Sequence, residues 1–144
     1  MLYNASDVAK YVLKKCTDNN SPISNLQLQK ILYFLQKEFL ITTGYPLFYD
    51  EIEAWQFGPV VPNVYYEYCS YGANPIAKIL DSYASLISAE ARKTADPIIE
   101  AKQKKYPWDL VEEAHKPGGA WAYIYANGSG NHRVIPIDLI REKG

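Results

Sequence analysis

The spacing of apolar residues predicts a helix at the start of the chain. Between residues 8 and 16, apolar side chains recur three and four positions apart and therefore share one helical face. Asn4 precedes this pattern and predicts the N-cap, with Asp7 in the favourable first turn. The polar segment 18–22 predicts the end of the helix near Thr17. The residues on the apolar face are Val8, Tyr11, Val12 and Cys16.

The second predicted helix is the most apolar element of the chain. Ser24 and Gln27 have the spacing of a capping box and predict its start. Gly44 predicts a left-handed stop after Thr43. A helix that is apolar over most of its circumference is usually central to a core, and we expect that position here. The apolar positions are Leu28, Ile31, Leu32, Leu35 and Phe39, widened by Tyr33, Phe34 and Leu40.

The stretch 53–65 has little conformational freedom because it combines large aromatic residues with two prolines. A residue before proline is disfavoured in helical geometry, and proline itself suits the first turn of a helix. We therefore predict an extended piece over Ile52–Phe57 and a rigid corner at Gly58-Pro59. A helix is predicted from about Pro62 to Tyr71, before Gly72.

The segment 76–115 predicts further helices that are separated by helix-breaking residues. Apolar spacing favours a helix over 76–87. Proline inside a helix removes a hydrogen bond, so we expect Asp96 to cap a new helix and Pro97 to be its first residue. A short helix is predicted over 107–115, because Pro107 opens it and Pro117 lies beyond its end.

The last third of the chain gives weaker signals. Trp121–Tyr125 is a short apolar run that fits either a helix or a strand. The segment 127–131 is expected to be a mobile loop, Arg133–Ile135 could add a strand to Ile52–Phe57, and Pro136 predicts the start of a terminal helix. The fold class expected for residues 1–144 is mainly α, a single compact helical domain with at most one small two-stranded β element.

Composition narrows the possible functions. The chain has 144 residues, of which 48% are hydrophobic, and this fits one ordinary globular domain. Its net charge of −1 provides no overall positive field, so we expect no nucleic-acid partner. No apolar run approaches the length of a membrane span, and the first residues lack a charged leader. These features predict a cytoplasmic protein.

Candidate catalytic chemistry is sparse. His115 and His132 are the only histidines, and neither lies in a nucleophile motif. Cys16 and Cys69 fall on predicted apolar helix faces, which predicts two buried free thiols. A pair of His115 with either thiol would require the fold to bring them together, so a hydrolase that uses His115 stays open as an alternative. We otherwise expect His115 to hydrogen-bond locally at the Pro117 turn, and we predict no catalytic residue, no metal and no cofactor.

Aromatic residues favour a binding function. Tyr and Trp dominate interface hot spots, and a rigid presentation lowers the entropy lost on association. Because large aromatic residues mostly lie in cores, Trp55 and Tyr65 are expected to pack on the helix over Ile31–Phe39. The better candidates for an exposed surface are Phe57, Tyr66 and Tyr71. The complete set of predicted partner contacts is Phe57, Pro59, Tyr66, Tyr71 and Trp121.

Several motifs follow one another along the chain. They are Leu28-x-Lys30-Ile31-Leu32-Tyr33-Phe34, Gly44-x-Pro46-Leu47, Ala54-Trp55, Gly58-Pro59-Val60 and Val64-Tyr65, continued more weakly by Pro107-Trp108-x-Leu110-Val111, His115 and Trp121. In this order they resemble the Panacea domain, a SocA-like family of phage- and prophage-associated proteins. The chain departs from the family pattern at Gly118-Gly119-Ala120, where an acidic residue and a proline are expected.

The resemblance implies a function that the residues alone do not supply. Panacea proteins act as antitoxins that bind and neutralise a toxin encoded beside them, so the implied partner is a cognate protein toxin. Two alternatives that also fit a binding protein are a proteolytic adaptor, with a protease as partner, and a phage factor that regulates its host. The residues that match the family motifs, and for which a structural role is implied, are Lys30, Tyr33, Trp55, Gly58, Pro59, Val60, Tyr65 and His115.

Overall fold

The two N-terminal helices have the predicted caps. The computed structural model describes residues 2–144, so Met1 lies outside it. In α1 (Ala5–Asp18) the Asn4 side chain accepts a hydrogen bond from the backbone N–H of Asp7 at 2.8 Å. In α2 (Asn25–Thr43) Ser24 and Gln27 form a reciprocal capping box. Gly44 ends α2 in the left-handed conformation with φ of 79°, which a glycine adopts without strain.

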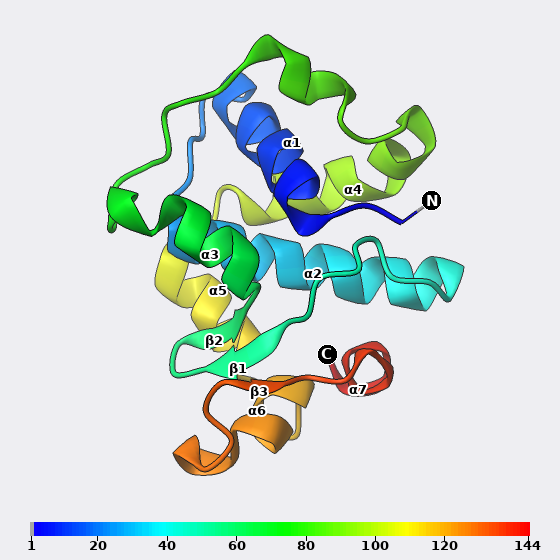
Figure 1. Cartoon of the computed structure of the whole chain (residues 1–144), viewed down its shortest axis with the longest axis vertical. Coiled ribbons are helices and arrows are strands. Elements are labelled where there is room, and N and C mark those ends of the chain that lie inside the picture. Colours follow the sequence, from blue (N-terminus) through cyan, green and yellow to red (C-terminus); the bar gives the residue numbers. More distant parts are fainter. Residues whose placement is uncertain (1) are drawn as a thin grey trace.

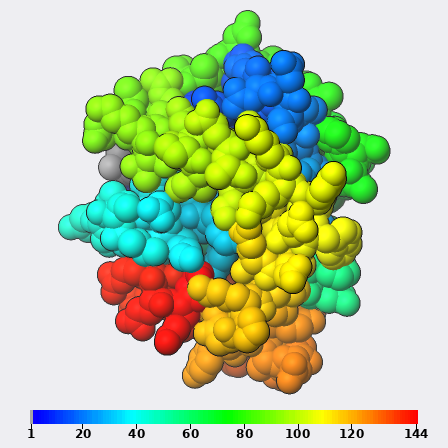
Figure 2. Space-filling model, turned by 180° about the vertical axis from the view of Figure 1, so that it is seen from behind, coloured from blue at the N-terminus to red at the C-terminus, as the bar shows by residue number. Residues whose placement is uncertain are grey.

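The helix α2 is the centre of the molecule, as its apolar sequence predicted. Figure 1 shows α2 running across the middle, with α1 and α4 (Ala89–Lys102) on one side and the strands, α6 (Ala120–Tyr125) and α7 (Ile137–Lys143) on the other. Seen from behind, α4, α5 (Pro107–Ala114) and α7 surround the part of α2 that reaches the surface (Figure 2). The fully buried side chains of α2 therefore contact elements from both halves of the chain.

The strands form one small antiparallel sheet in the order β2-β1-β3. Its members are β1 (Glu53–Trp55), β2 (Gly58–Val60) and β3 (Arg133–Val134). The predicted pairing of Arg133–Ile135 with Ile52–Phe57 is confirmed, because Glu53 pairs with Val134 and Ala54 with Arg133. The sheet has three strands rather than two, since the Gly58-Pro59-Val60 segment is itself a strand.

The rigid corner predicted at Gly58-Pro59 is wrong by two residues. The chain turns at Gln56-Phe57, and Pro59 lies within β2 opposite Ala54. Proline has no N–H for a sheet ladder, but β2 is an edge strand and tolerates it. The helix expected next is confirmed as α3 (Pro62–Tyr68), which continues into a 3-10 turn over Cys69–Tyr71.

Two helix predictions in the second half are wrong. The segment 76–87 is not an α-helix: only a 3-10 turn forms at Asp81–Ser85, and the segment is anchored by the buried Ile76 and Ile87 near its two ends. Pro97 does not begin a helix but lies inside α4, which Ser88 caps. The packing of Ala95 and Ile99 in the core stabilises α4 across the proline. The Asp96 carboxylate accepts a hydrogen bond from the Tyr11 hydroxyl instead of capping a helix.

The remaining C-terminal elements are compatible with the sequence. The predicted helix at Pro107 is α5, the ambiguous run at Trp121 is the helix α6, and Pro136 directly precedes α7. A 3-10 turn over Ala126–Gly128 overlaps the start of the segment 127–131, which was expected to be a loop. Within residues 2–144, none of the helices combines the length and the apolar character that crossing a membrane requires.

Candidate functional site

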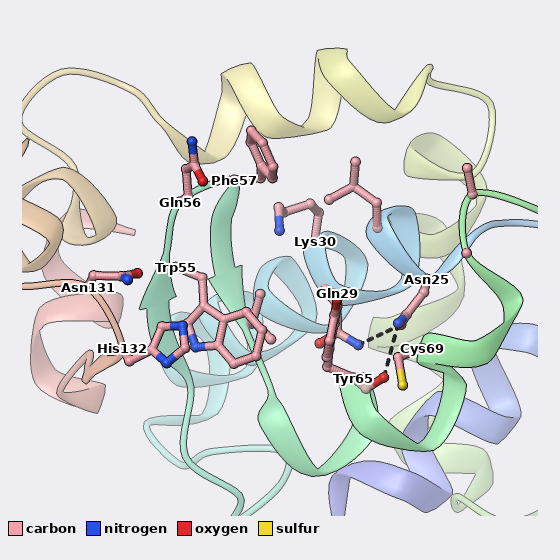
Figure 3. Close-up of a pocket in the computed structure, with 14 residues that line it drawn as sticks. Asn25, Gln29, Lys30, Trp55, Gln56, Phe57, Tyr65, Cys69, Asn131 and His132 are labelled. Carbon is pink, nitrogen blue, oxygen red and sulfur yellow. Dashed lines mark hydrogen bonds between the residues drawn. The ribbon is translucent and has the colours of Figure 1, made fainter. Parts of the chain in front are cut away.

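An open cavity of about 450 Å³ lies beside the N-terminal half of α2. Its walls come from α2, the β1–β2 hairpin, α3 with the following turn, and the loop that carries Asn131 and His132. Figure 3 shows the side chains of Lys30, Trp55, Phe57 and His132 around this space. Its size is within the range of ligand pockets, and it joins residues that are more than 100 positions apart in the chain.

Two buried amide side chains of α2 hold the walls of the cavity in place. Gln29 donates to the side-chain oxygen of Asn25 at 2.9 Å and accepts from the backbone N–H of Val61 at 2.9 Å. Asn25 in turn donates to the backbone carbonyl of Tyr65 at 3.1 Å (Figure 3). These bonds attach β2 and α3 to the first turns of α2, so the cavity has a preformed shape.

Lys30 is the charged residue of the cavity. Its side chain is 0% exposed, and its ammonium donates to the backbone carbonyl of Pro59 at 3.0 Å. Burial disfavours the charged form and lowers the pKa of Lys30 to about 7. Within residues 2–144, no carboxylate lies within ion-pair distance of this ammonium. Residues 2–144 thus bury the Lys30 amine without a counter-ion.

Gly58 is required where β2 passes the Lys30 side chain. Its φ of 115° lies in the region that favours glycine, and a Cβ atom there would be only 2.6 Å from Cε of Lys30. The Gly-Pro step in the sequence therefore serves a close approach between a strand and a buried lysine. This contact gives a physical reason for pairing Lys30 with the Gly58-Pro59 motif.

An aromatic stack forms the rim of the cavity. The rings of Trp55 and His132 lie parallel with centroids 4.3 Å apart, and Tyr65 meets Trp55 edge-on at 4.9 Å. His132 has an unusual φ of 69°, and its N–H donates to the carbonyl of Ala54 at 2.7 Å. Trp55 also donates through Nε1 to the Glu53 carboxylate at 2.9 Å. Each ring is therefore held in a defined orientation.

A second aromatic pair continues the rim away from the cavity. Phe57 is 49% exposed and Trp108 is 60% exposed, and their rings meet edge-on at 5.4 Å. Tyr66 is 63% exposed and lies 6.0 Å from Trp55, ring centre to ring centre. We call this surface the aromatic rim and define it by six residues: Trp55, Phe57, Tyr65, Tyr66, Trp108 and His132.

Some of the residues predicted to contact a partner lie on the surface, and others are buried. Phe57 and Tyr66 are exposed, and Tyr71 is half-buried against Tyr68. Pro59 and Trp121, which were expected to contact a partner, are buried instead. Trp121 donates through Nε1 to the carbonyl of Trp55 at 2.7 Å, and this hydrogen bond attaches α6 to the β1–β2 hairpin.

The expected packing of Trp55 and Tyr65 on the Ile31–Phe39 part of α2 is wrong. Both are half-buried and lie outside the hydrophobic core, beside the cavity and near the first turns of α2. Of the other family-motif residues, Tyr33 and Val60 are buried as expected for a structural role. Trp55 forms the last backbone pair of the β1–β2 hairpin, with Gly58, and so lies at the end of the sheet.

His115 has a structural environment. Its ring stacks on Trp121 with centroids 3.6 Å apart, instead of bonding at the Pro117 turn. Burial and the charge of Lys30 lower the pKa of His115, and a backbone hydrogen bond at Phe57 opposes this shift. Its Nε2 atom is buried, with no hydrogen-bond partner among residues 2–144.

The two thiols do not share an environment. Cys16 lies in the core, where burial raises the pKa of its thiol to about 12, so it carries no thiolate at neutral pH. Cys69 is exposed, and the prediction that it is buried is wrong because the helix α3 has changed to a 3-10 turn at that residue. Across residues 2–144, the His, Cys, Asp and Glu side chains form no group of three that could hold a metal ion.

Sequence reasoning missed four residues of the site. Asn25 and Gln29 are four positions apart in α2 and share a helical face with the apolar Leu28, and this spacing was an available sign of buried amides. Trp108 carried a weaker sign, since it precedes the apolar face of α5. No sequence pattern indicated the position of His132. That position depends on the close approach of Gly130 to Ile124, where a Cβ atom on residue 130 would lie 1.7 Å from the carbonyl oxygen of Ile124.

Comparisons with known proteins agree with this arrangement of motifs. A family model described as "Antitoxin SocA-like, Panacea domain" matches residues 28–122, which include most of the cavity wall. The protein named Antitoxin SocA from Caulobacter vibrioides (strain NA1000 / CB15N) is 34% identical over 146 residues, covering 94% of this chain and 77% of that protein. No solved structure matches the chain. The chain belongs to the SocA-like antitoxin family with a Panacea domain.

Proposed function

We propose that this protein neutralises a toxin encoded beside its own gene by binding it directly. Membership of the antitoxin family supports a toxin as the partner. The observation that carries direct binding is the aromatic rim, where exposed and half-buried aromatic side chains lie beside a preformed cavity. In this proposal both proteins act in the cytoplasm, as a prophage-type toxin–antitoxin pair.

The aromatic rim has the properties of a protein-binding surface. Trp and Tyr contribute most to interface hot spots because a rigid ring buries a large area at a low entropy cost. Phe57 and Trp108 expose about half or more of their side chains, which is costly for an isolated protein but favourable once a partner covers them. The hydrogen bonds of Asn25 and Gln29 fix the surface before binding, and this limits the ordering cost.

The proposed mechanism is masking, without catalysis by this chain. His115 stacks on a tryptophan, and Cys16 has a raised pKa in the core; neither environment activates a nucleophile. In the proposed complex, the toxin surface is covered and no covalent step takes place.

The test is a growth assay followed by co-purification. The neighbouring open reading frame is expressed from an inducible promoter, with and without this chain. Growth arrest that this chain relieves, together with co-purification of the two products, is the expected result. Relief without co-purification would replace direct binding by an indirect action such as proteolytic delivery. Absence of arrest would contradict the toxin–antitoxin assignment for this gene pair.

A further inference from the structure

The ammonium of Lys30 has unused hydrogen-bonding capacity. A lysine ammonium has three N–H donors, and among the described residues the acceptor in range is the carbonyl of Pro59. Figure 3 shows the Lys30 side chain in the wall of the cavity between Phe57 and Trp55, where it is fully buried. A buried lysine in the wall of a cavity, with N–H donors to spare, is suited to an anionic ligand.

The residues around Lys30 favour an anion. Among residues 2–144, those that line the cavity include none with an acidic side chain, whereas Asn25 and Gln29 place amide groups in its wall. Each of these amides donates one hydrogen bond to the protein and has a second N–H left. The cavity wall therefore contains one lysine amine, which is partly protonated at neutral pH because burial lowers the pKa of Lys30 to about 7, and additional donors, without a competing carboxylate among residues 2–144.

From this geometry we infer that the Lys30 cavity is a carboxylate-binding site, filled in the complex by an Asp or Glu side chain of the bound toxin. This inference rests on the proposed function. A carboxylate is planar and accepts hydrogen bonds on both oxygens, which suits the ammonium and a nearby amide together. It supplies the counter-ion that residues 2–144 do not provide.

A protein is favoured over a small molecule as the source of the carboxylate. The cavity opens directly onto the aromatic rim, and Trp55, Phe57, Tyr65 and His132 belong to both. A free carboxylate would neutralise Lys30 and leave the exposed Phe57–Trp108 pair uncovered. A protein segment covers the rim and inserts its acidic side chain in one event, so hydrophobic burial outside and charge pairing inside act together.

The first experiment tests the carboxylate site on the isolated chain. N-acetyl-L-glutamate is titrated into the wild-type protein, and the Lys30 Nζ and Cε signals are followed by NMR on lysine-labelled samples. Saturable binding that raises the pKa of Lys30 is expected, because a carboxylate stabilises the ammonium. N-acetyl-L-glutamine is the neutral control and is expected to leave these signals unchanged. No saturable change with N-acetyl-L-glutamate, or an equal change with both compounds, would overturn the inference.

The second experiment identifies the source of the carboxylate. Affinity for the purified neighbouring gene product is measured for wild type, Lys30→Met and the control Lys93→Met, which removes an exposed lysine on α4. Lys30→Met is expected to weaken binding by about 30-fold or more, since it removes one partner of a buried charge pair. Lys93→Met is expected to bind as wild type does.

Acidic residues of the toxin are then changed to amides one at a time. One such change is expected to weaken binding as much as Lys30→Met does, and the double variant is expected to add little further loss. Equal binding by wild type and Lys30→Met would overturn the inference and leave direct neutralisation intact. Failure of the wild-type protein to bind would instead contradict the proposed function, and the NMR titration would still decide whether the carboxylate site exists.

Discussion

Two buried polar side chains on α2, Lys30 and Gln36, are used in opposite ways. The Gln36 oxygen accepts from the backbone N–H groups of Leu47 and Phe48 at 2.8 and 3.2 Å, and its nitrogen donates to the carbonyl of Phe48 at 2.9 Å. Lys30 has one hydrogen-bond acceptor among residues 2–144 and lies fully buried in the wall of the cavity. Gln36 is thus satisfied by its own chain, whereas Lys30 is not.

The Gln36 side chain therefore stabilises the fold, whereas the Lys30 side chain does not. Buried polar groups contribute to stability when their hydrogen bonds are made, and they cost free energy when they are not. Gln36 fixes the loop that leads from α2 to the hairpin. Lys30 lies on the same helix with a pKa lowered by burial, so the folded chain disfavours its charge. The carboxylate proposed above would stabilise the charged form of Lys30.

The largest expected loss of stability is at Gln36, whose side chain is hydrogen-bonded within the chain. Gln36→Leu leaves two backbone N–H groups and one carbonyl buried without partners, so we expect the free energy of unfolding to fall by about 4 kcal/mol. Urea unfolding followed by circular dichroism measures the change. Lys93→Met is the control and should stay close to wild type. A loss as small as that of the control would show that the Leu47–Phe48 loop does not depend on Gln36.

Gly58→Ala is expected to have the second-largest effect, on the Lys30 side. The substitution combines a φ of 115° with a Cβ atom placed against the Lys30 side chain, and we expect a loss of about 2 kcal/mol. Gly44→Ala is the comparison variant, because Gly44 has a positive φ but open space around its Cβ position. If both variants lose the same stability, the contact with Lys30 contributes nothing beyond backbone strain.

The third prediction concerns pH. The pKa of Lys30 is about 7 in the folded chain and 10.5 as the ordinary value, so the unfolded chain binds more protons between these two pH values. Stability from this group therefore rises with pH above 7, by roughly 1 kcal/mol for each pH unit.

Lys30→Met should remove that rise, and Lys93→Met should retain it. Urea unfolding at several pH values between 7 and 9.5 measures the slope, below the range in which tyrosines titrate. Identical slopes in wild type and Lys30→Met would mean that the lysine is not desolvated in solution.

The smallest change in stability is expected at the aromatic rim. Phe57→Ala and Trp108→Ala remove side chains that are about half or more exposed, so each should cost less than about 1 kcal/mol. Each should nonetheless weaken binding to the neighbouring gene product by about 10-fold or more. Tyr45→Ala removes an exposed aromatic ring just beyond the C-terminal end of α2 and should leave binding unchanged. Loss of affinity in Tyr45→Ala but not in Trp108→Ala would relocate the interface.

Predictions from the sequence were accurate where they depended on residues close together in the chain, and less accurate where contacts with distant residues decided the structure. Asn4, Ser24 and Gly44 act on their own helix ends, so the bounds of α1 and α2 were predictable. Pro97 was misleading, because the burial of Ala95 and Ile99 outweighs the local cost of a proline in α4. The apolar spacing over 76–87 was misleading too, since only its ends reach the core.

The candidate site was predicted in part for the same reason. Phe57 and Tyr66 lie on a turn and on the outward face of a short helix, and their exposure could be inferred from nearby residues. Pro59 and Trp121 are buried by contacts from elsewhere in the chain, and the position of His132 depends on its backbone bond to Ala54.

By itself, the sequence determined the class of the fold, the central position of α2 and the family. These properties follow from the period of apolar residues, from helix caps and from ordered motifs, all of which are local along the chain. Only the tertiary structure decided that Lys30 is buried without a counter-ion and that Trp55 and His132 stack at the mouth of its cavity. Burial and charge pairing depend on which distant segments of the chain come into contact. At this site, that contact is the packing of the β1–β2 hairpin against α2.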